Sequence, residues 1–201
     1  IRDRYDYVYE TERLAGLKGK KLAAKRNHIN RFLEQHDWSY ERITSDNKEL
    51  CWEMEQSWFE LHMQEPGVEK RELEAERKAI RTALDHYEEL ALSGGILMAD
   101  GRVVAFCIGE ELNPETMVVH FEKAYPDVQG AFQMINREFA GNNCKDYKYI
   151  NREEDTGDMG LRKAKMSYYP DAFAKKYYAV ESNITHATGR DEAQIINLWH
   201  S

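Results

Sequence analysis

Cysteine is scarce in this sequence, and the three cysteines, Cys51, Cys107 and Cys144, lie far apart. An odd number of widely spaced cysteines predicts a reducing compartment rather than a disulfide framework. A zinc site needs ligands at closer spacing, so no metal site is predicted. Cys107 lies inside the apolar run 103–108, which favours buried packing over a role as a nucleophile.

Long apolar runs and an excess of positive charge are also lacking. The longest apolar stretches, residues 94–99 and 103–108, are far shorter than the roughly 20 residues that cross a bilayer, so no membrane span is predicted. The first residues include neither Met nor a charged-then-apolar leader, so we expect no signal peptide and a cytoplasmic location. The net charge of −8 argues against a surface that binds nucleic acid or anionic lipid as a whole. Any site for a polyanion must be a local patch.

The 201 residues, of which 42% are hydrophobic, are enough for one complete core. Asp100-Gly101 lies between apolar runs and predicts a hairpin. Periodicity predicts strands over residues 5–9, 38–43, 96–99, 102–108, 116–123, 147–152 and 173–180, and helices over 18–32, 45–61, 69–92, 130–139 and 161–166. Gly94-Gly95 is expected to end the helix 69–92. This order predicts an α/β (α+β) fold with a mixed sheet flanked by helices, and it resembles the core of GNAT acyltransferases as well as parts of other domains.

The first long predicted helix is basic. Residues 18–31 include lysines and arginines but no acidic residue. Asn27 adds hydrogen-bonding capacity to the charges of Lys25 and Arg26, which favours phosphate binding. A solvated helix face explains the same pattern, and both interpretations stay open.

Polar residues on two predicted strands form a second candidate group. Acyl transfer to an amine needs a group that removes a proton and donors for the developing oxyanion. His120 and Glu122 share one face of their strand, and Asn151 and Glu153 share one face of the next strand. If these strands are neighbours, Glu122, Asn151 and Glu153 converge as catalytic candidates.

Structural roles are the alternative for the same strand residues. His120 can pack in a core, and Glu122 can pair with Lys123 or Arg152. Neither alternative is excluded by the sequence.

Residues 149–157 carry more carboxylates than a loop needs for solubility. Their spacing lacks the pattern of a calcium loop, which favours hydrogen bonding to an amine-bearing substrate. On the helix that follows, Arg162 and Lys165 lie on one side and can hold a phosphate. Surface ion pairs are the alternative for these cations.

CoA-dependent GNAT enzymes bind pyrophosphate with backbone N–H groups at the start of the helix after the fourth strand. The corresponding loop here, residues 127–132, contains Gly130. Asp127 and Phe132 stand at the other positions of the motif, and their charge and bulk disfavour pyrophosphate.

Four strings of the sequence together carry a family resemblance. They span residues 19–30, 119–123, 130–133 and 149–165, the last ending in Gly160-Leu161-Arg162-Lys163-Ala164-Lys165. Over residues 5–180 the chain resembles the soluble relatives of the phosphatidylglycerol lysyltransferase C-terminal domain. The resemblance implies one half of a tandem GNAT-like arrangement, in which two halves face a groove as in the Fem peptidyltransferases.

The resemblance also implies an activity: aminoacyl transfer from an aminoacyl-tRNA to an amine or hydroxyl acceptor. No bound cofactor is firmly implied, and aminoacyl-tRNA or acyl-CoA is the donor co-substrate. Local basic patches would bind tRNA, and the acceptor is a small molecule or a lipid headgroup. Glu122, Asn151 and Glu153 would bind or deprotonate substrate. The implied substrate-binding residues are Lys25, Arg26, Asn27, His120, Arg152, Arg162 and Lys165.

Three segments are expected along the chain. Residues 1–37 are assigned to the end of a preceding GNAT-like half with its basic helix, and 38–182 to a GNAT-like acyltransferase domain. Residues 183–201 are a linker or the start of a further acetyltransferase domain. Two other functions stay open, namely a non-catalytic groove for a phosphorylated ligand and an acyl-CoA-dependent N-acetyltransferase.

Overall fold

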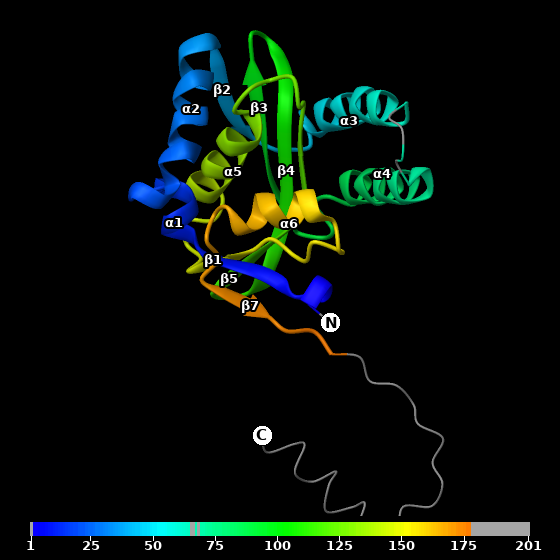
Figure 1. Cartoon of the computed structure of the whole chain (residues 1–201). Coiled ribbons are helices and arrows are strands. Elements are labelled where there is room, and N and C mark those ends of the chain that lie inside the picture. Colours follow the sequence, from blue (N-terminus) through cyan, green and yellow to red (C-terminus); the bar gives the residue numbers. More distant parts are fainter. Residues whose placement is uncertain (1, 65–66, 68, 178–201) are drawn as a thin grey trace, which may run out of the picture.

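A computed structural model of the protein describes residues 2–64, 67 and 69–177 (Figure 1). These residues form a seven-stranded sheet with the strand order β2-β3-β4-β5-β6-β1-β7. The strands are β1 (Asp6–Glu10), β2 (Trp38–Arg42), β3 (Ser93–Ala99), β4 (Arg102–Asn113), β5 (Thr116–Ala124), β6 (Tyr149–Asn151) and β7 (Ala172–Ala174). The helices are α1 (Thr11–Gly16), α2 (Ala23–Gln35), α3 (Lys48–His62), α4 (Lys70–Asp85), α5 (Ala131–Asn142) and α6 (Met159–Met166). The predicted α/β fold, a mixed sheet flanked by helices, is confirmed.

The helices lie on both sides of the central strands. In Figure 1, α1, α2 and α5 lie on one side of β4, and α3 and α4 lie on the other. Apolar side chains of β4, among them Phe106 and Ile108, are fully buried. The core therefore follows the middle of the sheet, as the apolar run in the sequence predicts.

The hairpin of β3 and β4 forms as predicted. Asp100 and Gly101 both have positive φ angles, 51° and 79°, as a type I′ turn requires. The glycines before the hairpin differ from expectation, because Gly94 and Gly95 lie within β3 instead of ending a helix. A Cβ on Gly95 would lie 1.9 Å from the Tyr40 hydroxyl of the neighbouring strand, so close packing explains this glycine.

Several predicted boundaries were wrong. The helix expected over 69–92 ends at Asp85, and the chain then turns through residues 86–91. The helix expected from residue 18 begins at Ala23, after a short 3-10 turn. Helix α1 was not predicted. The strand expected over 173–180 is shorter, because β7 ends at Ala174 and residues 175–177 are not in a strand. Residues 178–180, like the segment 183–201, lie outside the described residues.

Strand β1 connects the N-terminal segment to the rest of the sheet. It pairs antiparallel with β6 on one edge and with β7 on the other. The sheet therefore crosses the boundary predicted at residue 37, and the tandem arrangement stays a prediction.

Strand β5 has very different contacts with its two neighbours. It pairs antiparallel with β4 from Thr116 to Ala124. With β6 it pairs in parallel, and only over Thr116–Val118. Helix α5 makes the crossover between these parallel strands. Beyond Val118 the two strands separate, and this opening holds the site described next.

Candidate functional site

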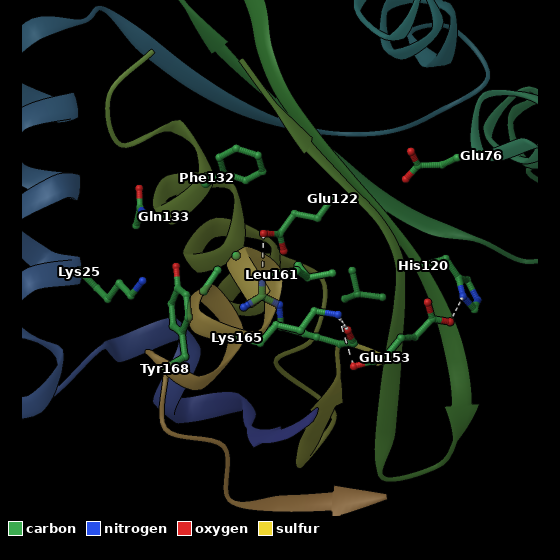
Figure 2. Close-up of a pocket in the computed structure, with 14 residues that line it drawn as sticks. Lys25, Glu76, His120, Glu122, Phe132, Gln133, Glu153, Leu161, Lys165 and Tyr168 are labelled. Atoms are coloured by element: carbon green, nitrogen blue, oxygen red, sulfur yellow. Dashed lines mark hydrogen bonds and ion pairs between the residues drawn. The ribbon is translucent and has the colours of Figure 1, made fainter. Parts of the chain in front are cut away.

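The separation of β5 from β6 opens a cavity of about 470 Å³ (Figure 2). Such a volume lies within the usual range for small-molecule sites. Its walls come from α2, α4, β5, α5, the segment after β6, and α6. The residues that line it are Lys25, Glu76, Val119, His120, Glu122, Phe132, Gln133, Arg152, Glu153, Gly160, Leu161, Ala164, Lys165 and Tyr168.

An ion pair between Glu122 and Arg152 crosses the opening. Arg152 Nη2 donates to Glu122 Oε1 at 2.8 Å, and each side chain is only 12% exposed. Asn136 of α5 donates to the other carboxylate oxygen at 3.2 Å. Arg152 Nη1 is buried without a hydrogen-bond partner among the described residues. The sequence alternative in which Glu122 pairs with Arg152 is thus confirmed.

His120 is held between two carboxylates. Its Nδ1 lies 3.0 Å from Glu153 Oε1, and its Nε2 lies 2.9 Å from Glu110 Oε1. The hydrogen bond with Glu153 raises the pKa of His120, and the one with Glu110 adds to this effect against the opposing effect of burial. His120 is therefore hydrogen-bonded rather than packed in a core.

Glu110 is a site residue that the sequence reasoning missed. In the hairpin of β4 and β5, Glu110 lies opposite Val118, so it is a diagonal neighbour of His120. The register shifts between Ile108 and Gly109, which makes His120 the extra residue of a bulge. The hairpin pattern could have indicated the proximity, but the bulge could not be read from the sequence.

The opposite end of the cavity is cationic and aromatic. Lys25 Nζ lies 4.1 Å from the centre of the Tyr168 ring, and the Arg152 guanidinium carbon lies 5.1 Å from it. Burial, followed by the nearby charge of Arg152, lowers the pKa of Lys25. Figure 2 shows Lys25 and Tyr168 at one end and His120 at the other. A ligand that spans the cavity would meet cations at one end and carboxylates at the other.

Lys165 reaches the cavity from α6 but is directed at backbone. Its Nζ donates to the carbonyl oxygens of Arg152 at 2.6 Å, Glu154 at 2.5 Å and Glu153 at 3.4 Å. The side chain is buried, and this burial, together with the charge of Arg152, lowers the pKa of Lys165 to about 8.

Asn151 does not join the other catalytic candidates. Its side chain is buried, donates to Asp6 Oδ2 at 3.0 Å, and accepts from the backbone N–H of Glu153 at 2.8 Å. Strand alternation, which predicted convergence, stops because β6 ends at Asn151 and Glu153 has a left-handed φ of 54°. The expectation that Asn151 lies beside Glu122 was therefore wrong, although Glu122 and Glu153 do line one cavity.

Three other predicted residues also lie outside the cavity lining. Arg162 pairs with Asp155 and Asp3, at 2.7 Å and 2.6 Å, as the ion-pair alternative predicted. Arg26 donates to backbone carbonyls before α2, and Asn27 is exposed on that helix. The cavity therefore unites the remaining predicted residues, which are Lys25, His120, Glu122, Arg152, Glu153 and Lys165.

The start of α5 is covered by α2. Gly130 has a φ of 91°, and a Cβ there would lie 2.5 Å from the carbonyl oxygen of His28 and 3.0 Å from Phe32. Glycine thus allows α2 to approach the N-terminus of α5 closely. On this side the start of α5 packs against α2, while Phe132 and Gln133 of its first turn line the cavity.

No helix in the described part of the chain combines the length and the apolar character needed to cross a bilayer.

Comparison with known proteins gives relatives that are longer than this chain. A crystal structure of a conserved protein of unknown function from Bacteroides thetaiotaomicron is 46% identical, with a TM-score of 0.78, over 86% of this chain and 57% of that one. An uncharacterized protein of Mycoplasmoides gallisepticum is 24% identical over 86% of this chain and 54% of its own length. The chain therefore spans little more than half of the relatives that it matches.

A structure and a family model connect the chain to named proteins. The C-terminal domain of a putative lysylphosphatidylglycerol synthetase from Agrobacterium fabrum superimposes with a TM-score of 0.61 at 14% identity, over 87% of this chain and 58% of that one. This likeness concerns the fold alone. The family model for the phosphatidylglycerol lysyltransferase C-terminal domain matches residues 1–180. The chain therefore belongs to the phosphatidylglycerol lysyltransferase C-terminal family.

Proposed function

We propose that the cavity between β5 and β6 is the site of an acyltransferase that moves an aminoacyl group from an aminoacyl-tRNA to an amine or hydroxyl. The observation that carries this proposal is the pairing of Glu153 with His120 in the same cavity as Arg152, whose Nη1 lacks a partner among the described residues. A proton acceptor and a cationic donor are the groups that acyl transfer needs. Family membership supports the same class of reaction.

In the proposed reaction the acceptor attacks the carbonyl carbon of the aminoacyl ester directly. Glu153 takes the proton that the acceptor nitrogen or oxygen loses, and its carboxylate is accessible because the side chain is 40% exposed. The guanidinium of Arg152, which lines the cavity, donates to the oxyanion that forms on the carbonyl oxygen. When the intermediate collapses, the ester C–O bond breaks and the leaving ribose hydroxyl receives the proton.

The remaining candidates have supporting roles in this proposal. Glu122 orients Arg152 through their ion pair. Asn151 acts as a positioning residue, because its side-chain oxygen accepts from the backbone N–H of Glu153. His120 holds the carboxylate of Glu153 by a charge-assisted hydrogen bond when the imidazole is protonated.

The proposed donor is aminoacyl-tRNA rather than acyl-CoA. Lys25, beside Tyr168, offers a cation to a phosphate at one end of the cavity. Exposed Lys18, Lys20 and Lys21 extend this charge before α2 and can hold more of the tRNA backbone. Asp127 and Phe132, at the positions where a CoA site places its motif residues, disfavour pyrophosphate by their charge and bulk.

The proposed acceptor carries an amine or hydroxyl and is a small molecule or a lipid headgroup. An amine placed at the His120 end would meet the carboxylate of Glu153, which favours an acceptor that enters from this side.

Donor binding to the full-length protein provides the first test. We expect aminoacyl-tRNA to bind more tightly than acetyl-CoA, with an affinity that falls as salt rises. Replacing Lys18, Lys20 and Lys21 by Met should weaken tRNA binding by roughly 10-fold or more. Lys70→Met, an exposed lysine of α4, is the matched control. Binding of neither donor would refute the proposal.

Turnover of aminoacyl-tRNA provides the second test. Glu153→Gln should slow transfer by roughly 100-fold while donor binding is retained, because only the proton acceptor is lost. Glu53→Gln, an exposed carboxylate of α3, is the control. Donor binding with no transfer to any amine or hydroxyl acceptor would assign the cavity to non-catalytic binding of a phosphorylated ligand.

A further inference from the structure

The segment 152–154 follows the end of β6, and its residues Arg152 and Glu153 line the cavity. Pairing of β6 with β5 and with β1 ends at Asn151. Directly after it, Arg152 reaches Glu122 and Glu153 reaches His120. Two backbone hydrogen bonds with Tyr7 of β1 still hold this segment, one from the N–H of Arg152 and one to the carbonyl of Glu153, and side-chain contacts add to them.

Lys165 supplies those contacts from α6. Its Nζ donates to the carbonyl oxygens of Arg152, Glu153 and Glu154, at 2.6, 3.4 and 2.5 Å. A lysine ammonium has three N–H donors, so its donors match three acceptors in number. The residue is only 8% exposed, which leaves water little opportunity to replace these bonds.

Helix α6 is itself anchored on both sides of Lys165. The Tyr9 hydroxyl of β1 donates to the carbonyl oxygen of Lys165 at 2.8 Å. One turn earlier, Arg162 is bound to the buried side chain of Asp155. These contacts fix the position of α6, and the fixed helix in turn sets the direction of the Lys165 side chain.

We propose that Lys165 is a positioning residue, whose ammonium group holds the backbone of residues 152–154 and thereby sets Arg152 and Glu153 in the cavity. Its donors are directed at the protein, so it does not bind the phosphate of a ligand. The proposal deepens the proposed function and rests on it for its catalytic meaning. Its structural part can be tested without turnover.

Amide hydrogen exchange tests the structural part. The backbone N–H groups of Arg152 and Tyr7 bond across this segment, to the carbonyls of Tyr7 and Glu153. Lys165→Met keeps an unbranched side chain but removes the donors, and should raise the exchange rates of these amides by roughly 10-fold or more. Lys163→Met, the exposed lysine on the same helix, should leave them unchanged.

The pKa of His120 is a second readout, measured by NMR titration of its ring protons. The hydrogen bond that the His120 ring donates to Glu153 raises this pKa, so displacement of Glu153 in Lys165→Met should lower it toward the ordinary value of about 6.5. Unchanged exchange rates and an unchanged His120 pKa, together with weaker donor binding, would overturn the proposal and make Lys165 a ligand-binding residue.

One further measurement uses the unaltered protein and therefore does not require Lys165→Met to fold. The ammonium protons of Lys165 should exchange with water more slowly than those of exposed Lys163 in ¹⁵N-resolved spectra. Equal exchange rates would overturn the proposal. Lys165→Arg keeps the charge but has a planar group, and should restore only part of the amide protection.

Turnover separates this proposal from the proposed function. If both hold, Lys165→Met lowers kcat while donor affinity stays within about 3-fold, because the chemistry and not the binding is disturbed. If the protein shows no transfer at all, the proposed function fails, and amide exchange and the His120 titration still decide the role of Lys165.

Discussion

The two edges of β5 differ in what fills the space beside them. Toward β4 the strands pair along their length and bury apolar side chains such as Phe106. Toward β6 the pairing stops at Val118, and the opening is filled by ion pairs and by hydrogen bonds to backbone carbonyls. The closed edge draws its stability from apolar burial. The open edge gains less stability from burial, because its polar groups lose hydration, but these groups can bind a ligand.

The largest effect is expected at the closed edge. Phe106→Ala should lower the free energy of unfolding by about 3–5 kcal/mol, because Phe106 is fully buried and its loss leaves a cavity. Chemical denaturation measures the change. Phe132→Ala, in a cavity-lining side chain that is 40% exposed, should cost about 1 kcal/mol or less. If both variants lost the same free energy of unfolding, the closed edge would not depend on apolar burial more than the open edge does.

The next effect concerns the anchor of α6. Arg162→Met leaves the buried carboxylate of Asp155 without its ion partner and should lower the free energy of unfolding at pH 7. The hydrogen bonds from Arg162 hold the pKa of Asp155 well below its usual range, so their contribution is present above the unfolded pKa of about 3.9 and is lost as pH falls. Denaturation at pH 7 and at pH 3 should show a smaller difference from the unaltered protein at pH 3. A difference that grows toward pH 3 would contradict this assignment.

A smaller cost is expected across the opening. Glu122→Gln removes the charge that balances Arg152 and should lower the free energy of unfolding by about 2 kcal/mol, since hydrogen bonds to charged groups contribute about 1.5–3 kcal/mol. Glu49→Gln is the control, because its ion pair with Arg81 lies on the surface and should cost about 0.5 kcal/mol or less. If both changes cost the same, the pair in the opening is no more protected from solvent than a surface pair.

The smallest effect concerns His120. Its folded pKa is raised, so its contribution to stability is fully present below the unfolded pKa of about 6.5 and is lost as pH rises through the folded value. His120→Gln should therefore be less stable than the unaltered protein at pH 5.5, with a difference that shrinks by pH 9. Denaturation curves at these two pH values measure it, and a constant difference would assign His120 a role without charge.

The sequence predicts the closed edge better than the open one. Asp100-Gly101 and the apolar run after it determine the hairpin locally, because turn chemistry and alternation need no distant partner. The joint placement of Glu122 and Glu153 in one cavity was also predicted, although Glu153 lies beyond the end of β6 and not in the strand that the prediction assumed. Asn151 was misplaced because alternation assumes a continuing strand, and β6 ends there.

Other errors share this cause. Gly94 and Gly95 resemble a helix stop in the sequence, but their role depends on the proximity of Tyr40 from another strand. Glu110 was missed because its contact with His120 depends on a register shift. Helix α1 is too short to have a clear period. Contacts between residues that are distant in the sequence determine each of these features, and a local sequence pattern does not predict such contacts.

Because Glu153 has a left-handed backbone, selection for stability and selection for function favour different residues at this position. A residue with a Cβ pays about 1 kcal/mol for this conformation, which glycine adopts without that cost. Screening variants for thermal stability alone would therefore favour Glu153→Gly and remove the carboxylate from the cavity. A laboratory evolution experiment on this domain would have to keep Glu153 unchanged. Glycine fits the left-handed backbone best there, but it removes the carboxylate from the cavity.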